Sequence, residues 1–455
     1  MELDLVTDLS WLATMPPWLR AALDPERIVA ALTAAVPGVA FKGAKVKRLL
    51  LDARVRRWVG TYQVATARGT TALRGTLTPP HLAGREAAAG QAAGARFGQS
   101  GWRCHLPELG LDLEPQPPET VLAAYDGLTD PGQAAAVLAR ALDRPVASCA
   151  VETLVYKPGS RAVLRYRPAY PPGTDGPPVV IAKTYRTRKG ANAYEAMLAL
   201  WRTPLPRDGR VALAEPLAWV PELKLLLQGT VPGERTLEGV LATTLAAGGE
   251  GVPDEVGRLL AAAARGLAAV HGSGSDHPRT ASLDDRLGDA RELLDLLVEA
   301  VPAPELAAGV GPLLSRLEAL AQAHPAAPAV LSHGTFDPEQ VLLDGERVGI
   351  IDFDDACLAE PAMDVGLFMA AIPDLAYEAG APAGAPARLD RAAAMAEAFL
   401  AAYEQAGGTV SRARVSLWQA ADHLVHALQT WTKAKPAGPA KDLRILDHHL
   451  RHLRV

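Results

Sequence analysis

The spacing of apolar residues changes once along this chain, and that change limits the folds it can adopt. Between residues 151 and 228, β-prone apolar runs cover 151–156, 162–167, 179–185, 213–219 and 223–228, with one helical pattern at 191–201. From residue 236 onward the apolar residues recur at helical spacing, over 254–271, 283–300, 306–323, 388–405, 411–433 and 441–454. Apolar runs bounded by turn residues favour strands, and a 3.6-residue period favours helices. The sequence therefore predicts a five-stranded β lobe with one helix, followed by a helical lobe.

A further α/β region is predicted before these two lobes. A helical pattern at 25–36 precedes strand-like runs at 46–52 and 59–67, and an Ala/Gly-rich segment follows at 81–94. We expect an α+β protein in three parts. These are an N-terminal accessory region at 1–140, a β lobe at 141–234 and a helical lobe at 235–455.

Charge and cysteine usage exclude several classes of protein. The 455 residues contain 46 Lys and Arg against 51 Asp and Glu, so the net charge of −5 gives no global attraction to nucleic acid or anionic lipid. Cys104, Cys149 and Cys357 are widely spaced, which argues against a disulfide framework or a zinc knuckle. The acidic first 19 residues do not resemble a secretory signal, and no uncharged apolar run reaches the roughly 18 residues that span a bilayer. We expect a cytoplasmic protein that binds neither nucleic acid nor membrane.

One hairpin inside the helical lobe carries the densest set of polar residues. Residues 331–343 read LSHGTFDPEQVLL, and residues 344–355 read DGERVGIIDFDD. An Asp-Gly pair between two apolar runs is a strong hairpin signal, and it brings Gln340 at the start of one strand near Asp352 at the end of the other. Amide and carboxylate oxygens are ligands that Mg²⁺ takes alongside phosphate oxygens. We therefore predict a metal site formed by Gln340 and Asp352, with Asp354 as a further ligand.

With these residues the chain resembles the aminoglycoside phosphotransferase and choline kinase-like family, relatives of the protein kinases. The family's catalytic loop reads His-Gly-Asp with an Asn five residues after that Asp, and its next hairpin ends in Ile-Asp-Phe or Ile-Asp-Trp. His333, Gln340 and Asp352 stand at the corresponding positions here. The resemblance implies a bilobal, protein-kinase-like fold that uses ATP and Mg²⁺.

The same resemblance implies a set of nucleotide-binding residues. Lys183, at the end of a Val-Val-Ile-Ala-Lys run, would contact the α- and β-phosphates, and Glu195 on the next helix would pair with it. A solvated lysine at a strand end is the alternative for Lys183. Asp364 matches an aspartate that supports the catalytic loop. Four more residues are implied at the nucleotide: Lys157 and Ser160 in the turn over the phosphates, and Gln228 and Thr230 in the hinge between the lobes.

The catalytic loop departs from the family at one position, where Thr335 replaces the catalytic aspartate. A hydroxyl cannot act as a carboxylate base near neutral pH. Asp337, two residues further on, is the candidate replacement, and we expect His333 to hold the loop. The candidate catalytic residues are thus Asp337, His333 and Thr335.

Two functions follow from this departure. The first is an ATP- and Mg²⁺-dependent phosphotransferase acting on a hydroxyl of a small molecule, such as a sugar, an aminoglycoside or a choline-like alcohol. The second is a pseudokinase, a nucleotide-binding or scaffold subunit of a complex that matures a peptide. Thr335 favours the second function, and the set of Lys183, Glu195, Gln340 and Asp352 favours the first.

Two other groups of residues are weaker candidates. Asp285, Asp289, Glu360 and Asp422 are acids that would suit an acceptor cleft, although nothing in the sequence joins them. The histidine pairs at 423 and 426 and at 448 and 452 have helical spacing but no third ligand, so zinc is not favoured.

Overall fold

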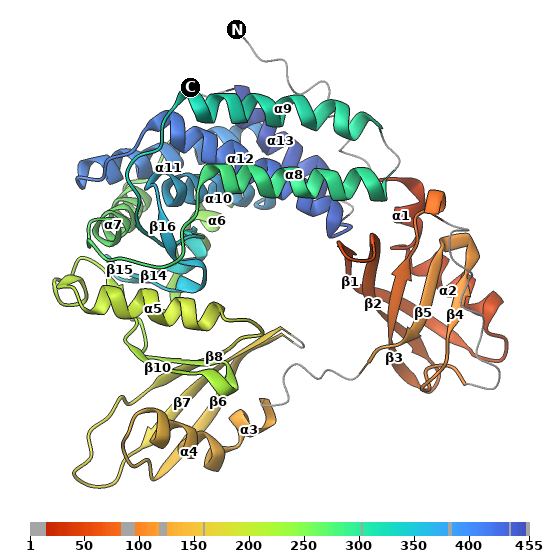
Figure 1. Cartoon of the computed structure of the whole chain (residues 1–455), viewed down its shortest axis with the longest axis horizontal. Helices are drawn as coiled ribbons and strands as arrows, with labels where there is room; N and C mark the ends of the chain where they lie inside the picture. The colour runs from red at the N-terminus through yellow and green to blue at the C-terminus, as the bar shows by residue number, and fades with distance from the viewer. Residues whose placement is uncertain are drawn as a thin grey trace. The chain divides into compact units, whose positions relative to one another are not determined.

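The computed structural model of the chain describes residues 15–82, 96–117, 125–157, 160–301, 304–380, 385–435 and 438–451 (Figure 1). The chain packs into two compact units. The first unit consists of residues 1–118, 284–322 and 420–453, and the second of residues 119–283, 323–419, 454 and 455. Across the described ranges, no helix is long and apolar enough to cross a bilayer. The functional division at residues 140 and 234 stays a prediction.

The first unit contains a five-stranded antiparallel sheet in the order β1-β2-β3-β5-β4. Its strands are β1 (Phe41–Asp52), β2 (Arg57–Thr66), β3 (Gly69–Leu77), β4 (Cys104–Leu106) and β5 (Leu111–Pro115). Its helices are α1 (Pro17–Ala21), α2 (Pro25–Ala35), α8 (Leu283–Ala300), α9 (Pro304–Ala323) and α13 (Gly438–Arg451), with the second part of α12 (Arg412–Thr432). Trp58 and Tyr62 are fully buried on one sheet face. A Cβ at Gly75 would lie 2.3 Å from the Tyr62 ring, so glycine makes room for it.

The predicted elements of this unit are partly confirmed. The helix at 25–36 is α2, and the runs at 46–52 and 59–67 are parts of the longer strands β1 and β2. Strands β3, β4 and β5 were not predicted, because the Gly- and Thr-rich sequence of β3 and the three-residue length of β4 give little apolar signal. Most of the Ala/Gly-rich segment at 81–94 lies outside the described residues.

The second unit begins with the predicted β lobe, a five-stranded antiparallel sheet in the order β10-β11-β8-β7-β6. Its strands are β6 (Ser148–Lys157), β7 (Arg161–Ala169), β8 (Val180–Thr184), β10 (Pro216–Val220) and β11 (Leu225–Gln228). The expected helix at 191–201 is α5 (Lys189–Trp201). The run predicted at 213–219 is divided between β9 (Ala212–Leu213) and β10, because Pro216 has no amide hydrogen to continue the first strand.

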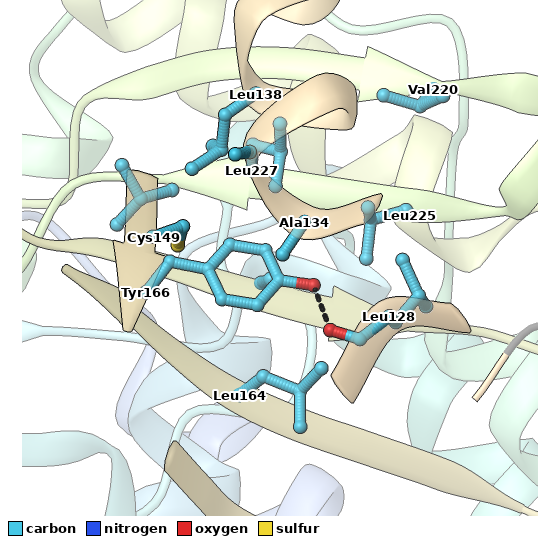
Figure 2. Close-up of a cluster of buried hydrophobic side chains, with 12 residues drawn as sticks. Leu128, Ala134, Leu138, Cys149, Leu164, Tyr166, Val220, Leu225 and Leu227 are labelled. Atoms are coloured by element: carbon cyan, nitrogen blue, oxygen red, sulfur yellow. Dashed lines mark hydrogen bonds between the residues drawn. The ribbon is translucent and has the colours of Figure 1, made fainter. Parts of the chain in front are cut away.

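The core of this lobe lies between the sheet and the helices α3 (Tyr125–Thr129) and α4 (Pro131–Ala141) (Figure 2). Leu164 and Tyr166 on β7 are fully buried against Leu138 and the neighbouring strands. The Tyr166 hydroxyl donates a hydrogen bond of 2.9 Å to the carbonyl of Leu128 at the end of α3. A polar group in an apolar core is thus satisfied by a helix-end carbonyl that would otherwise have no partner.

The helical part of the second unit is built around the predicted hairpin. Its helices are α6 (Leu237–Ala246), α7 (Asp254–His271), α10 (Ala362–Glu378), α11 (Ala385–Gln405) and the first part of α12. The hairpin strands are β14 (Val341–Asp344) and β15 (Arg347–Ile350), in a small sheet in the order β12-β14-β15-β9, where β12 is Arg235–Thr236. Two further strands, β13 (Val330–Ser332) and β16 (Cys357–Ala359), pair with each other next to the hairpin. The predicted class, α+β with an antiparallel β lobe and a larger helical lobe, is confirmed.

We predict that Tyr166→Phe lowers the free energy of unfolding by about 1–2 kcal/mol, because it leaves the Leu128 carbonyl buried without a partner. Urea denaturation measures this as a shift in midpoint at unchanged slope. Tyr194→Phe is the matched control. Tyr194 is half-buried on α5, and its hydroxyl makes no hydrogen bond within the described part of the chain. Equal stabilities of the two variants would mean that the Tyr166 hydrogen bond contributes nothing.

Candidate active site

The site is centred on a short turn directly after β15. Residues Phe353–Asp355 form the 3₁₀ turn η7, and Asp352 stands at its start with φ 73° and ψ 53°. This left-handed conformation is costly for a residue with a side chain and persists only where the surroundings impose it. We call residues 352–355 the acid turn, because three of its four residues are aspartates.

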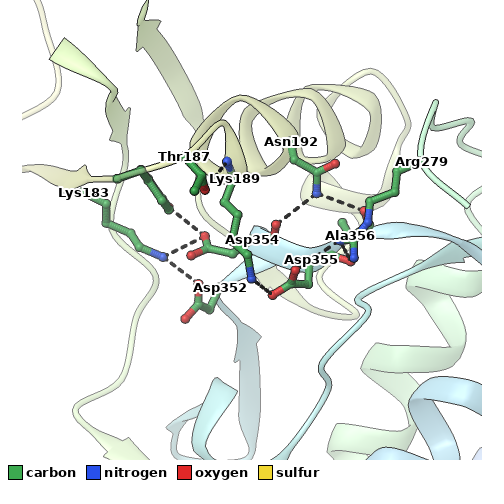
Figure 3. A network of polar contacts seen from close by, with 10 residues as sticks. Lys183, Thr187, Lys189, Asn192, Arg279, Asp352, Asp354, Asp355 and Ala356 are labelled. Atoms are coloured by element: carbon green, nitrogen blue, oxygen red, sulfur yellow. Dashed lines mark hydrogen bonds and ion pairs between the residues drawn. The ribbon is translucent and has the colours of Figure 1, made fainter. Parts of the chain in front are cut away.

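Lys183 joins the β lobe to the acid turn (Figure 3). It lies on β8 and is only 8% exposed. Its Nζ lies 2.6 Å from Oδ1 of Asp352 and 3.1 Å from Oδ1 of Asp354. The Tyr185 hydroxyl donates a hydrogen bond of 2.7 Å to the same Oδ1 of Asp354. Lys183 is therefore not a solvated lysine at a strand end, and two carboxylates converge on one cation.

The two carboxylates differ in how strongly they hold a proton. Burial favours the neutral form of Asp352, but the Lys183 ammonium outweighs it, so the pKa of Asp352 is lowered. Burial and the neighbouring charge of Asp352 raise the pKa of Asp354, against the opposing effect of Lys183. Asp352 is therefore ionised near neutral pH, whereas the ionised form of Asp354 would be stabilised by an added cation.

The third aspartate, Asp355, is held by two more cations. Lys189 Nζ lies 2.7 Å from its Oδ2, and Arg279 Nη1 lies 3.2 Å from its Oδ1. Arg279 Nη1 also donates to the Asp355 carbonyl over 2.9 Å. Lys189 and Arg279 are each about half exposed, so solvent weakens these pairs.

The expected ion pair between Glu195 and Lys183 is not formed in the described structure. Lys183 is bound to the acid turn, and the Glu195 side chain is exposed on α5. The helix instead presents Asn192 to the acid turn, where its Nδ2 donates to the carbonyls of Asp354 over 3.1 Å and Ala356 over 3.0 Å. The sequence reasoning missed Asn192 because an isolated asparagine on a helix carries no signal of its own.

The catalytic loop is fixed by a fully buried carboxylate. Asp364 accepts hydrogen bonds from the amides of His333, over 2.6 Å, and Gly334, over 2.9 Å. His271 Nε2 lies 3.0 Å from Asp364, and its Nδ1 lies 2.7 Å from the Tyr403 hydroxyl. Burial would raise the pKa of Asp364, but these donors lower it overall, so the carboxylate stays ionised. Asp364 therefore supports the loop, as expected.

His333 packs under the loop rather than facing solvent. It is fully buried, and its Nε2 donates to the carbonyl of Ile351 over 2.9 Å. Burial lowers the pKa of His333 in spite of the Asp364 charge, so the ring is neutral. Gly334 has φ 91°, and a Cβ there would lie 2.0 Å from the Asp355 carbonyl oxygen. The catalytic loop and the acid turn are thus in direct contact.

The other catalytic-loop candidates have distinct environments. Thr335 is exposed, and Asp337 is half-buried. The Asp337 carboxylate caps the short turn Pro338–Gln340 by accepting from the amides of Glu339 and Gln340, over 2.8 Å and 3.3 Å. Burial, opposed by these amides, raises the pKa of Asp337 to about 6. A carboxylate that titrates near neutral pH is suited to accept a proton.

Gln340 is less available than the sequence suggested. Its Oε1, the predicted metal ligand, accepts from the Asp337 amide over 3.0 Å and completes a capping box. The Asp-Pro-Glu-Gln sequence carries the signature of such a cap, which the metal-site interpretation did not use. The structure therefore brings Asp352 and Asp354 together but keeps Gln340 bound to the backbone.

The four predicted nucleotide contacts lie around the β lobe. Lys157 is exposed, and its backbone carbonyl accepts a hydrogen bond of 3.0 Å from the Ser160 amide. Residues 158 and 159 between them lie outside the described structure. Gln228 ends β11 opposite Ile181 of β8, and Thr230 is exposed two residues later. The roles of Lys157, Ser160, Gln228 and Thr230 stay predictions.

The weaker acid candidates are divided between the two units. Asp285, Asp289 and Asp422 belong to the first unit, where Arg286 pairs with both Asp289 and Asp422. Glu360 is buried in the second unit in a salt bridge with Arg414. His452 and the side chain at 448 are outside the described residues. Among the side chains that are described, no three from His, Cys, Asp and Glu are arranged to hold a metal. Two convergent carboxylates without a third suit a hydrated Mg²⁺, which usually takes one or two carboxylates together with phosphate oxygens and water.

A model of the phosphotransferase enzyme family matches residues 173–418, which is more than half of the chain. The chain belongs to this family. The resemblance read from the catalytic loop and the Ile-Asp-Phe hairpin is therefore confirmed. No curated protein matches the sequence.

The chain is also similar to solved structures, three of which follow. One is a choline/ethanolamine kinase family protein from Mesorhizobium loti, with 18% identity, a TM-score of 0.44 and coverage of 67% of this chain and 86% of that one. The second is choline kinase LicA from Streptococcus pneumoniae, with 14% identity, a TM-score of 0.41 and coverage of 67% and 92%. The third is macrolide 2'-phosphotransferase MphH from Brachybacterium faecium, with 18% identity, a TM-score of 0.40 and coverage of 69% and 97%.

We predict that Gly334→Ala destabilises the protein by at least about 2 kcal/mol, because the new Cβ meets the Asp355 carbonyl in a left-handed conformation. Gly345→Ala is the control, since Gly345 also has positive φ, at 62°, but has open space around it. The control should lose only about 1 kcal/mol from the backbone conformation. Thermal denaturation of both variants measures the difference, and equal losses would show that the contact between loop and acid turn is not tight.

Proposed function

We propose that this chain is an ATP- and Mg²⁺-dependent phosphotransferase that acts on a hydroxyl group of a small molecule. The observation that carries the proposal is the convergence of Asp352 and Asp354 on the buried Lys183 ammonium, on the turn that follows the catalytic-loop hairpin. Membership of the phosphotransferase family supports the same conclusion. A cytoplasmic location, where ATP and Mg²⁺ are available, belongs to the proposal.

In this mechanism Lys183 would bind the α- and β-phosphates, and Asp352 and Asp354 would hold Mg²⁺. The metal ion would neutralise charge on the transferred γ-phosphoryl group. The new bond forms between the acceptor oxygen and the γ-phosphorus, and the bond from that phosphorus to the bridging oxygen of ADP breaks. The proton of the acceptor hydroxyl passes to the Asp337 carboxylate, whose pKa of about 6 suits a base. Asp364 and neutral His333 keep the loop in place.

A second candidate function is a pseudokinase that binds nucleotide and acts through a peptide or protein partner. Thr335 presents a neutral, exposed hydroxyl where the family has its base. The side chains of Asp337 and Gln340 are engaged in a capping box with the local backbone. Both observations favour a loop built for stability more than for proton transfer. In either case residues 1–140 would serve as a platform for the substrate or partner.

We predict that Lys183→Ala weakens nucleotide binding at least about tenfold, because it removes a desolvated charge from the phosphates. Calorimetry with ADP and with a non-hydrolysable ATP analogue, each with and without Mg²⁺, measures the loss. Arg188→Ala is the matched control, since Arg188 is an exposed cation five residues further on. Equal affinities of Lys183→Ala and the wild type would remove the basis for a nucleotide site here.

We predict that Asp337→Asn lowers turnover about 10²- to 10⁴-fold, the usual contribution of a positioned general base. Asparagine keeps the cap, so stability should stay close to that of the wild type, whereas Asp337→Ala should lose about 1 kcal/mol more. Because the base must be ionised, wild-type turnover should rise as the pH rises through about 6, and the Asn variant should lack this limb. The measurements are steady-state kinetics over a pH series and urea denaturation.

The contrary outcomes separate the two functions. Full small-molecule phosphorylation by Asp337→Asn would exclude Asp337 as the base. Thr335→Asp, which restores the family residue, should keep or raise ATP hydrolysis in an active enzyme. In a pseudokinase both substitutions leave a background rate unchanged and alter only activity that depends on a partner.

A further inference from the structure

A single side chain ties helix α5 to the backbone of the acid turn. Both hydrogens of the Asn192 amide are used, because its Nδ2 donates to the carbonyl of Asp354 over 3.1 Å and to that of Ala356 over 3.0 Å. Figure 3 shows Asn192 reaching from the helix to these two carbonyls, which flank Asp355. The hydrogen bonds therefore fix two successive points of the turn relative to the helix.

The other contacts between this region and the acid turn differ in kind. Lys183 and Tyr185 bind carboxylate oxygens at the ends of side chains and make no hydrogen bond to the backbone of the turn among those described. Lys189 reaches Asp355 from the same helix, but its side chain is 54% exposed, and such a pair contributes little. Arg279 holds the Asp355 carbonyl from outside α5. Among the described hydrogen bonds, those of Asn192 are the ones that join α5 to the backbone of the turn.

The orientation of the carboxylates depends on this backbone. Asp352 has left-handed φ and ψ angles, which carry a conformational cost for a residue with a Cβ, and Asp354 lies in the middle of the 3₁₀ turn. A small rotation of the turn would separate the two carboxylates, which now converge on one ammonium. Groups that hold metal ligands in orientation often change metal affinity 10- to 100-fold when they are lost.

We propose that Asn192 is a positioning residue that couples helix α5 to the metal-binding carboxylates Asp352 and Asp354. It acts through the backbone of the acid turn. It links α5 to the site, a link that an ion pair between Glu195 and Lys183 would otherwise provide. This inference rests on the proposed function, because it assigns those carboxylates to Mg²⁺. A shift of α5 would then move the acid turn, and with it the two carboxylates, through two neutral hydrogen bonds.

The test compares nucleotide affinity with and without Mg²⁺ in the full chain. Asn192→Ala removes both donors, and Asn192→Asp keeps the shape but sets a carboxylate against two carbonyls and Asp354. Both variants should need at least about tenfold more Mg²⁺ to reach the wild-type affinity for ADP. Their affinity for ADP without Mg²⁺ should stay within about twofold. Arg188→Ala, at the start of the same helix, is the control.

Glu195→Gln tests the alternative that Glu195, not Asn192, links α5 to the metal-binding carboxylates. An unchanged Mg²⁺ requirement in Asn192→Ala, or an equal rise in Glu195→Gln, would overturn the role of Asn192. A loss of ADP affinity that is the same with and without Mg²⁺ would also overturn it, because that result marks general damage to the fold.

Hydrogen exchange in the absence of ligands keeps the inference separate from the proposed function. In Asn192→Ala, amides of residues 352–358 should exchange at least about tenfold faster, and those of the hairpin at 341–350 should be unchanged. If wild type binds no nucleotide, the proposed function fails, and the Mg²⁺ role of Asn192 fails with it. Faster exchange would then still establish the tie between helix and turn, and unchanged exchange would refute that tie as well.

Discussion

The arrangement of the site depends on one buried carboxylate, that of Asp364. It accepts the amides of His333 and Gly334 and lies within hydrogen-bonding distance of His271. An ionised group this deep in a protein is stable only when donors surround it, and three donors do so here. Two of these donors are consecutive backbone amides of the catalytic loop. The need to hydrogen-bond the Asp364 carboxylate therefore also fixes the backbone conformation of the loop at His333 and Gly334.

The catalytic loop held by Asp364 contacts the acid turn, and the acid turn contacts the β lobe. His333 holds the Ile351 carbonyl immediately before Asp352, and Gly334 allows the Asp355 carbonyl to approach. The acid turn in turn receives Lys183 from β8 and Asn192 from α5. Segments that lie more than 150 residues apart thus meet through polar contacts.

Much of the fold was predictable because strongly patterned segments decide it. The five strands of the β lobe, α5 and the hairpin at 341–350 follow apolar runs and an Asp-Gly turn in the sequence. The weakly apolar strand β3 gave no such signal. The grouping of α8 and α9 with the N-terminal sheet depends on contacts between distant segments, which periodicity does not encode.

The site was predictable to the extent that motifs fix it. The Ile-Asp-Phe motif led to Asp352 and Asp354, and the β-strand lysine led to Lys183. The residue of α5 that contacts the acid turn was not predictable from the sequence. Only the rotation of α5 about its axis decides whether Asn192 or Glu195 faces the turn. The sequence also carried the local signal of the capping box at Asp337 and Gln340. That signal was not used, because Gln340 was interpreted as a metal ligand.

The contact between Gly334 and the Asp355 carbonyl has a mechanical consequence. Because no side chain separates them, any displacement of the catalytic loop toward the acid turn would press it against the Asp355 carbonyl. Lys183 and Asn192 reach this pair of segments from the β lobe through polar contacts. Loss of these contacts would expose the carboxylates of Asp352 and Asp354 while the catalytic loop keeps its hydrogen bonds to Asp364.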